Sequence, residues 1–421
     1  MLRRLRLVDF KSFADEAVEL APLTLLVGAN ASGKSNCLDA LRFLHQTNVD
    51  QSIVEILDGE QRPGAGPNAW QGLRGGSKEV SRIGAESFLL ESTWDIESTW
   101  DSAELPMAQI SGPISAMHQI RCRTAPRPAW EEEGIYTGDA RPLLVARAIA
   151  HGDGGARRVE WTSPTGSVAT ANGHDQTILW TILGSIGPGH PRVITGEAVN
   201  AAWALSEAFK RIVELEINPA RMRGYGATNR VEMDFNGGNF SGALWTLCRD
   251  PEQKQSLVDW LTEVLAPEIA DLDFVHVAEL GDVMAMLVER DGKRISSRSL
   301  SDGTLRFLGM LVALRTAAPG SVFLIEEIDG GLHPARLHIL VEFLELLARE
   351  RRIQVIATTH SPVMLQAVPR ETLLSAVVFG RVAEHEGTIM RRLGDLPRFE
   401  ETLERTGIDE LFATGWLEMA L

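Results

Sequence analysis

Residues 28–35, GANASGKS, have the types and spacing needed to bind the phosphate groups of a nucleotide. They fit the pattern G-x-x-x-x-G-K-[ST], whose glycines let backbone N–H groups face phosphate oxygens. Lys34 would place positive charge on the β- and γ-phosphates, and the Ser35 hydroxyl could ligate Mg²⁺. A chance glycine-rich turn is the alternative. The apolar run before this phosphate loop and the amphipathic pattern after it instead predict a strand–loop–helix setting.

Two adjacent carboxylates, Glu326 and Glu327, follow a second apolar run, VFLI. At the carboxyl end of a strand in an α/β sheet, such groups face the ligand crevice. Successive strand residues point to opposite faces, so we expect different roles for the two. Glu326 is predicted to bind Mg²⁺ and Glu327 to activate the attacking water. A solvated strand end is the alternative.

His360 follows a third apolar run, QVIATT. A histidine at a strand end can hydrogen-bond a γ-phosphate or the attacking water. The alternative is a structural histidine whose hydrogen bonds are satisfied within the fold. The phosphate loop and the acidic pair elsewhere in the chain favour the functional role.

The segment LSDGT, residues 300–304, predicts a second anion-binding site. Ser301 and Thr304 stand at the entrance to a buried helix expected from Arg306 onward, and free N–H groups at such an entrance attract anions. One nucleotide needs only one such site. A second becomes useful if two copies of the chain meet head to tail, so that Ser301–Thr304 faces the γ-phosphate bound by Lys34 of the other copy. A plain helix N-cap is the alternative.

The elements that must position these residues indicate an α/β fold. The C-terminal third alternates strand, helix and strand, which favours a parallel sheet. We expect three parts: residues 1–172 with the phosphate loop and a β-rich lobe, a mainly helical insert over 173–290, and residues 291–421 with the acidic pair and His360.

Composition limits the partners that the chain can have. A net charge of −16 argues against a surface uniformly adapted to nucleic acid, so any DNA contact would need a local basic patch. Three separated cysteines favour a reduced chain, and no signal peptide or membrane-length apolar run is visible, so we expect a cytoplasmic protein. Two short basic clusters permit a DNA contact, although solvated surface faces explain them equally well: Arg3, Arg4 and Arg6, and Arg221, Arg223 and Arg230.

Four motifs resemble, in their order and spacing, those of the ABC-type ATPases of the RecF/SMC-like group. They are GANASGKS, LSDGT, LIEEIDGGLHP and TTHSP. The likeness is greatest to the ATPase portion of OLD-family nucleases and to stand-alone AAA/ABC ATPases of bacterial defence. It extends to LRLVDFKSF before the first strand, to LRGG at residues 73–76 and to the tail IDELFATGWLE. The resemblance implies an ATPase head, with a mostly parallel core sheet flanked by helices, that forms a homodimer around ATP.

The same resemblance implies ATP and Mg²⁺ as ligands and suggests a role for each matching residue. Glu327 would be the base and His360 the switch histidine, while Ser35 and Glu326 would bind Mg²⁺. Nucleotide contacts would come from three places. The phosphate loop and the start of its helix would contribute Gly28, Asn30, Ser32, Gly33, Lys34, Ser35 and Asn36, and a loop that lies near the nucleotide in relatives would contribute Lys11 and Ser12. The signature segment (residues 300–304) of the opposite subunit would contribute Ser301, Asp302 and Gly303. The sequence departs from the family pattern at Ile328, where a proline is common, and no glutamine can be placed in the Q-loop.

We expect ATP hydrolysis to gate a separate effector, such as a nuclease, in defence against phage or in DNA processing. OLD nucleases carry a TOPRIM domain with an Asp-x-Asp pair, and no such pair follows His360 here. A RecF-like DNA-repair ATPase that binds DNA directly is one alternative. A non-catalytic, ATP-dependent scaffold is another.

Overall fold

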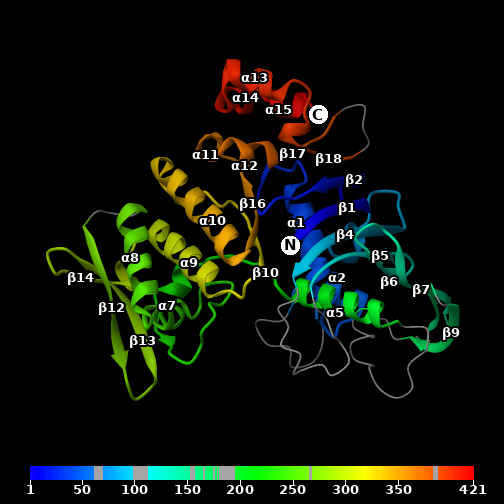
Figure 1. The fold of residues 1–421 in the computed structure, drawn as a ribbon, viewed down its shortest axis with the longest axis horizontal. Helices are drawn as coiled ribbons and strands as arrows, with labels where there is room; N and C mark the ends of the chain where they lie inside the picture. Colours follow the sequence, from blue (N-terminus) through cyan, green and yellow to red (C-terminus); the bar gives the residue numbers. More distant parts are fainter. Residues whose placement is uncertain are drawn as a thin grey trace.

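Three sheets and the helices around them form the molecule in the computed structural model (Figure 1). A core sheet lies between an antiparallel N-terminal sheet and a smaller sheet at the opposite side, and the helices near the C-terminus cover one end. The structure describes residues 1–60, 70–97, 112–151, 157–164, 166–173, 176–177, 179, 195–264, 268–382 and 387–421.

The core sheet confirms the predicted α/β fold with a mostly parallel sheet. Its first five strands are parallel and its last pairs in the antiparallel direction. Their order is β10 (Ile212–Glu214), β15 (Val322–Ile325), β16 (Gln354–Thr359), β3 (Leu23–Val27), β17 (Val377–Gly380) and β18 (Ile389–Arg392). The parallel pairing places the carboxyl ends of β15, β16 and β3 side by side at one edge.

Both faces of this sheet are buried, which explains why its strands are continuous apolar runs. Along β3, Leu25 and Val27 belong to one hydrophobic core, whereas Leu26 belongs to the other. The helices α9 (Asp302–Thr316) and α10 (Leu337–Arg351) contribute to the first core. The helices α1 (Lys34–Gln46) and α5 (Gly196–Lys210) contribute to the second.

The predicted β-rich lobe is an eight-stranded antiparallel sheet. It packs its apolar face on the core that contains α1 and α5. Its strands, in spatial order, are β2 (Phe13–Glu19), β1 (Leu2–Phe10), β4 (Ser87–Glu97), β5 (Pro113–Arg123), β6 (Ala129–Thr137), β7 (Pro142–His151), β8 (Arg157–Ser163) and β9 (Gly166–Gly173).

The middle of the chain combines helices with strands. The third sheet consists of β11 (Gly226–Ala227), β13 (Asp282–Glu289), β12 (Ile269–Val277) and β14 (Arg294–Ser296). Strand β10 pairs with β15, which joins this middle segment to the core sheet. The part boundaries at residues 172 and 290 remain predictions.

The remaining helices have between 4 and 14 residues, and none of the helices in the described ranges combines the length and apolar character that a membrane span requires. They are α2 (Ile53–Asp58), α3 (Gly76–Glu79), α6 (Pro219–Met222), α7 (Phe240–Cys248), α8 (Pro251–Val264), α11 (Pro362–Ala367), α12 (Arg370–Ser375), α13 (Phe399–Thr406), α14 (Ile408–Ala413) and α15 (Trp416–Met419).

Candidate functional site

The phosphate loop connects the buried strand β3 to α1, and its course requires glycine at two positions. Gly28 has a φ of 144° and Gly33 a φ of 113°, both in the region that L side chains rarely adopt. A Cβ on Gly28 would lie 2.4 Å from the carbonyl oxygen of Phe379, and one on Gly33 would lie 2.7 Å from the Thr388 hydroxyl. The backbone can therefore wrap tightly only with glycine at both ends of the loop.

Two polar groups of this loop are buried and suited to an anion. The Lys34 ammonium donates hydrogen bonds to the carbonyl oxygens of Gly28, at 2.7 Å, and Ala29, at 2.8 Å. Burial lowers the pKa of Lys34 to about 8, while the carboxylates of Glu418, Glu326 and Glu327 act in the opposite direction. The Ser32 hydroxyl has no hydrogen-bond partner in the described part of the chain. Phosphate oxygens would satisfy this hydroxyl and compensate the buried cation.

The acidic pair lies at the end of β15, where the backbone turns sharply. Glu327 has a φ of 50°, a left-handed conformation that is unusual for a residue other than glycine. Its backbone N–H donates to the Thr358 hydroxyl at 2.9 Å, and the N–H of Ile328 donates to the Thr358 carbonyl at 3.1 Å. A proline at position 328 would have no N–H for that bond, so isoleucine suits the local turn.

A cavity of about 440 Å³ brings most of the predicted site residues together. It connects the carboxyl ends of β3, β15 and β16, as expected from their parallel pairing. Its predicted lining residues are Asn30, Ser32, Gly33, Lys34, Ser35, Asn36, Glu326, Glu327 and His360. The juxtaposition is observed, and the individual roles remain predictions.

Two family models match the two parts of the chain that meet at this cavity. A model described as an AAA ATPase domain matches residues 1–87, which include the phosphate loop. A second, described as "AAA domain, putative AbiEii toxin, Type IV TA system", matches residues 246–365, which include the acidic pair and His360.

Curated relatives are DNA replication and repair proteins RecF. The protein from Acaryochloris marina (strain MBIC 11017) is 42% identical over 65 residues, which is 14% of this chain and 17% of the relative. The protein from Synechocystis sp. (strain ATCC 27184 / PCC 6803 / Kazusa) is 45% identical over 64 residues, 14% of this chain and 16% of the relative. The chain thus matches less than a fifth of the length of either. These sequence matches support a likeness to the RecF/SMC-like ABC-type ATPases.

Solved structures similar to this chain include SMC heads. The SMC head domain from Thermotoga maritima has 14% sequence identity and a TM-score of 0.41, covering 93% of this chain and 98% of that one. An Smc head bound to the C-winged helix domain of ScpA has 13% identity and a TM-score of 0.44, covering 96% of this chain and 99% of that one.

The signature segment is not among the described residues that line the 440 Å³ cavity of its own chain. Helix α9 begins at Asp302, earlier than the expected start near Arg306. Ser301 is its N-cap, as predicted, because its hydroxyl accepts a hydrogen bond from the Thr304 N–H at 3.2 Å. Its contact with the nucleotide of a second copy remains a prediction.

Lys11 and Ser12 border the phosphate loop from a neighbouring cavity of about 1110 Å³. The Lys11 ammonium donates to Asp39 Oδ2 at 2.5 Å and to the Arg74 carbonyl at 2.8 Å. Burial lowers the pKa of Lys11, and Asp39 opposes this shift. The Ser12 hydroxyl accepts a hydrogen bond from the Asn36 amide at 2.9 Å. Both residues thus bond side chains of α1 in this structure. A direct nucleotide contact remains a prediction.

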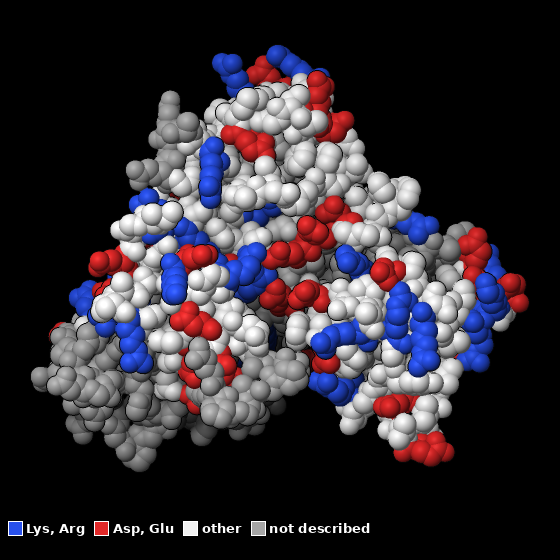
Figure 2. Space-filling model, turned by 180° about the vertical axis from the view of Figure 1, so that it is seen from behind, with Lys and Arg blue, Asp and Glu red and all other residues white. Residues whose placement is uncertain are grey.

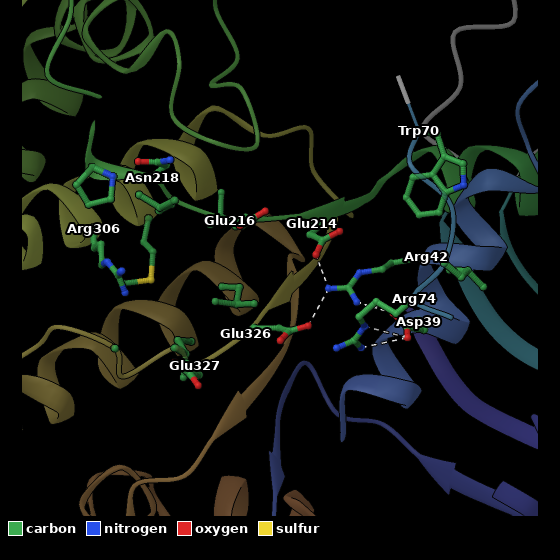
Figure 3. A pocket seen from close by; sticks show the side chains of 18 of the residues that line it. Asp39, Arg42, Trp70, Arg74, Glu214, Glu216, Asn218, Arg306, Glu326 and Glu327 are labelled. Atoms are coloured by element: carbon green, nitrogen blue, oxygen red, sulfur yellow. Dashed lines mark hydrogen bonds and ion pairs between the residues drawn. The ribbon is translucent and has the colours of Figure 1, made fainter. Parts of the chain in front are cut away.

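Three arginines at the site were not predicted. Arg74 and Arg381 line the 440 Å³ cavity, where they add positive charge. Arg74 also donates to the Ser35 carbonyl at 2.7 Å. Arg42 donates to Asp39 Oδ1 at 2.6 Å and to Glu326 Oε1 at 2.9 Å, and it also contacts Glu214 (Figure 3). Arg74 lies in the LRGG stretch. The Asp39–Arg42 pair, which interrupts the apolar residues of α1, was a further signal available in the sequence.

A second cavity, of about 690 Å³, lies beyond Glu326 and Glu327 (Figure 3). It adjoins the 440 Å³ cavity, because both are lined by Arg74 and the two glutamates. Residues 214–219 form one wall of this cavity, beginning at the last residue of β10. Arg306 of α9 forms another wall. No glutamine is among its described lining residues, so the Q-loop glutamine is still unplaced.

Proposed function

We propose that this chain binds Mg-ATP in the 440 Å³ cavity and hydrolyses the bond between its β- and γ-phosphates, so that water adds to the γ-phosphorus and ADP leaves. The observation that carries the proposal is the meeting, in one cavity, of the phosphate loop, the acidic pair and His360. Each comes from the end of a different strand, and these strands are neighbours in the sheet. This combination of cation, carboxylates and histidine is what phosphoryl transfer to water requires.

The proposed roles follow from position. Lys34 and the loop N–H groups bind phosphate oxygens, and Ser32 donates its buried hydroxyl to the same group. Ser35 and Glu326 supply oxygen ligands for Mg²⁺, which when bound neutralises charge on the β- and γ-phosphates. Glu327 accepts a proton from the attacking water, and His360 hydrogen-bonds the γ-phosphate.

Glu326 and Glu327 are held differently, which supports giving them different roles. Arg42 contacts the Glu326 carboxylate and orients it toward α1. In Figure 3 the Glu327 side chain leaves the strand end in another direction. Its backbone, anchored by Thr358, fixes where that carboxylate can reach.

The steady-state release of phosphate from Mg-ATP tests the enzymatic part. The purified chain is expected to turn over ATP, and Glu327→Gln is expected to bind ATP while losing at least about 100-fold in rate, as is typical for loss of a general base. Equal rates for both proteins would assign the activity to another residue. Tight binding without turnover by the unmodified chain would favour the scaffold alternative.

We further propose that two copies close around ATP head to tail. Support comes from the position of Ser301 and Gly303 at the N-terminus of a 15-residue helix, outside the cavity of their own chain. A helix N-terminus carries partial positive charge and free N–H groups, both of which favour a phosphate. The ATP-bound dimer would then gate a separate effector, such as a nuclease, in phage defence or DNA processing; this last step is supported by the family resemblance alone.

Direct DNA binding is the second candidate, because the curated relatives are named for DNA replication and repair. The two predicted basic clusters do not support it strongly, since five of their six arginines are paired with carboxylates: Arg3, Arg4, Arg6, Arg223 and Arg230. Over the described part of the face in Figure 2, basic and acidic side chains are intermixed. Duplex affinity that falls steeply with salt would favour this candidate.

A further inference from the structure

The entrance to helix α9 is held by an arginine from a distant part of the chain. Arg223, directly after α6, points its guanidinium at residues 297–302. Its Nη1 donates to the carbonyl oxygens of Leu300, at 2.7 Å, and Arg298, at 3.0 Å, with a longer bond of 3.4 Å to Ser297. Its Nη2 bonds the carboxylate of Asp302 at 2.5 Å. One side chain therefore bonds the backbone at three positions of the segment that leads into the signature.

Backbone packing holds the same helical turn at a second point. A Cβ on Gly303 would lie 2.2 Å from the carbonyl oxygen of Gly331, so the two glycine backbones are in direct contact. Gly331 belongs to the loop that follows Glu327. The first turn of α9 thus contacts both Arg223 and the loop of the acidic pair.

Asp302 creates an electrostatic problem for an anion at this entrance. It is the first residue of α9, and its side chain is 72% exposed. A carboxylate there stabilises the free helix N-terminus, but it would repel an approaching phosphate. Arg223 compensates that charge directly, and its own side chain is only 31% exposed.

We propose that Arg223 is a positioning residue of the composite site. It neutralises Asp302 and orients the 297–302 backbone, so that the N-terminus of α9 can receive the γ-phosphate bound by Lys34 of a second copy. This inference rests on the head-to-tail dimer proposed above. It adds a residue from outside the recognised motifs to the machinery that closes the dimer.

The test uses the full chain in a Glu327→Gln background, in which ATP should hold the dimer closed. Association with Mg-ATP is measured by light scattering across protein concentrations. Arg223→Gln is expected to weaken association by about tenfold or more, since it removes charge-assisted hydrogen bonds and leaves Asp302 uncompensated. Mg-ATP affinity of the single protomer, measured by calorimetry, should stay unchanged because Arg223 does not line the 440 Å³ cavity.

Rescue separates charge compensation from a purely structural role. Adding Asp302→Asn to Arg223→Gln removes the uncompensated charge and should recover about fivefold or more of the lost association. It cannot restore the bonds to the three carbonyl groups, so a purely structural role predicts no rescue. Arg230→Gln is the matched control: Arg230 lies on the same segment and pairs with Asp234, and its loss should leave association unchanged.

Each outcome decides the proposal. If Glu327→Gln does not associate with ATP, the dimer and the role of Arg223 are both wrong. If it associates and Arg223→Gln has no effect, the dimer stands and the role of Arg223 is wrong. If Arg223→Gln weakens association and Asp302→Asn gives no rescue, charge compensation is wrong and Arg223 acts through the 297–302 backbone alone.

Discussion

Arg42 Nη2 lies 2.9 Å from Oε1 of Glu326, and this contact joins the helix after the phosphate loop to the carboxylate that we propose binds Mg²⁺. The same guanidinium bonds Asp39, whose carboxylate is buried and also accepts bonds from Lys11 and Arg74. Glu326 is therefore not a free ligand at a strand end. It is oriented by a charged network that extends beneath the phosphate loop.

Replacing Arg42 should change the Mg²⁺ requirement of the ATPase. In Arg42→Gln, Glu326 loses the group that orients it, and such changes behind a metal ligand commonly cost about 10- to 100-fold in metal affinity or activity. We expect the Mg²⁺ concentration for half-maximal hydrolysis to rise about tenfold. Titration of Mg²⁺ at fixed ATP measures this. Arg349→Gln, at an exposed arginine of α10, is the control. An unchanged or lower Mg²⁺ requirement would contradict an orienting role.

Lys34→Ala should abolish tight Mg-ATP binding. The variant removes the ammonium group of the phosphate loop, which is buried beside the site where phosphate is expected. Calorimetry measures the affinity, and Lys210→Ala, at an exposed lysine of α5, is the matched control. Wild-type affinity in Lys34→Ala would show that this loop does not bind the nucleotide.

Mg-ATP affinity should fall at alkaline pH. The charged form of Lys34 binds phosphate, and its pKa of about 8 means that it loses its proton as the pH rises through that value. Affinity should therefore be nearly constant below pH 8 and then weaken by up to about tenfold per pH unit. Calorimetry between pH 7 and pH 9.5, with Mg²⁺ saturating, gives the profile. Constant affinity up to pH 9.5 would mean that Lys34 keeps an ordinary pKa or does not contact the nucleotide.

Mixed dimers should recover activity lost in two single variants. Lys34→Ala damages the phosphate loop of its own chain, whereas Ser301→Arg places a bulky side chain at the exposed cap of α9. Each homodimer then has one damaged half in every site, but a mixed dimer contains one intact site. An equal mixture should reach roughly a quarter of the wild-type ATPase rate, because half of the dimers are mixed and each has one working site. No recovery in verified mixed dimers would place the action of Ser301 within its own chain.

The sequence alone determined the parts of the site that depend on local geometry. The phosphate loop, the acidic pair and His360 each follow a buried strand, and the carboxyl ends of parallel strands meet at one edge whatever the rest of the chain does. The Ser301 cap was likewise predictable, because its bond reaches only three residues along the chain.

Only the tertiary structure decided which distant side chains reach those groups. Arg42 and Glu326 are 284 positions apart, and Arg223 and Asp302 are 79 apart. The pairing of β10 with β15, which brings Glu214 to the same arginine, is also a long-range choice. Hydrophobic periodicity indicates which face of each element is buried, but the order of strands in a sheet and the docking of one helix on another depend on packing between segments far apart in the chain. The charged contacts that orient Glu326 and Asp302 arise from that packing.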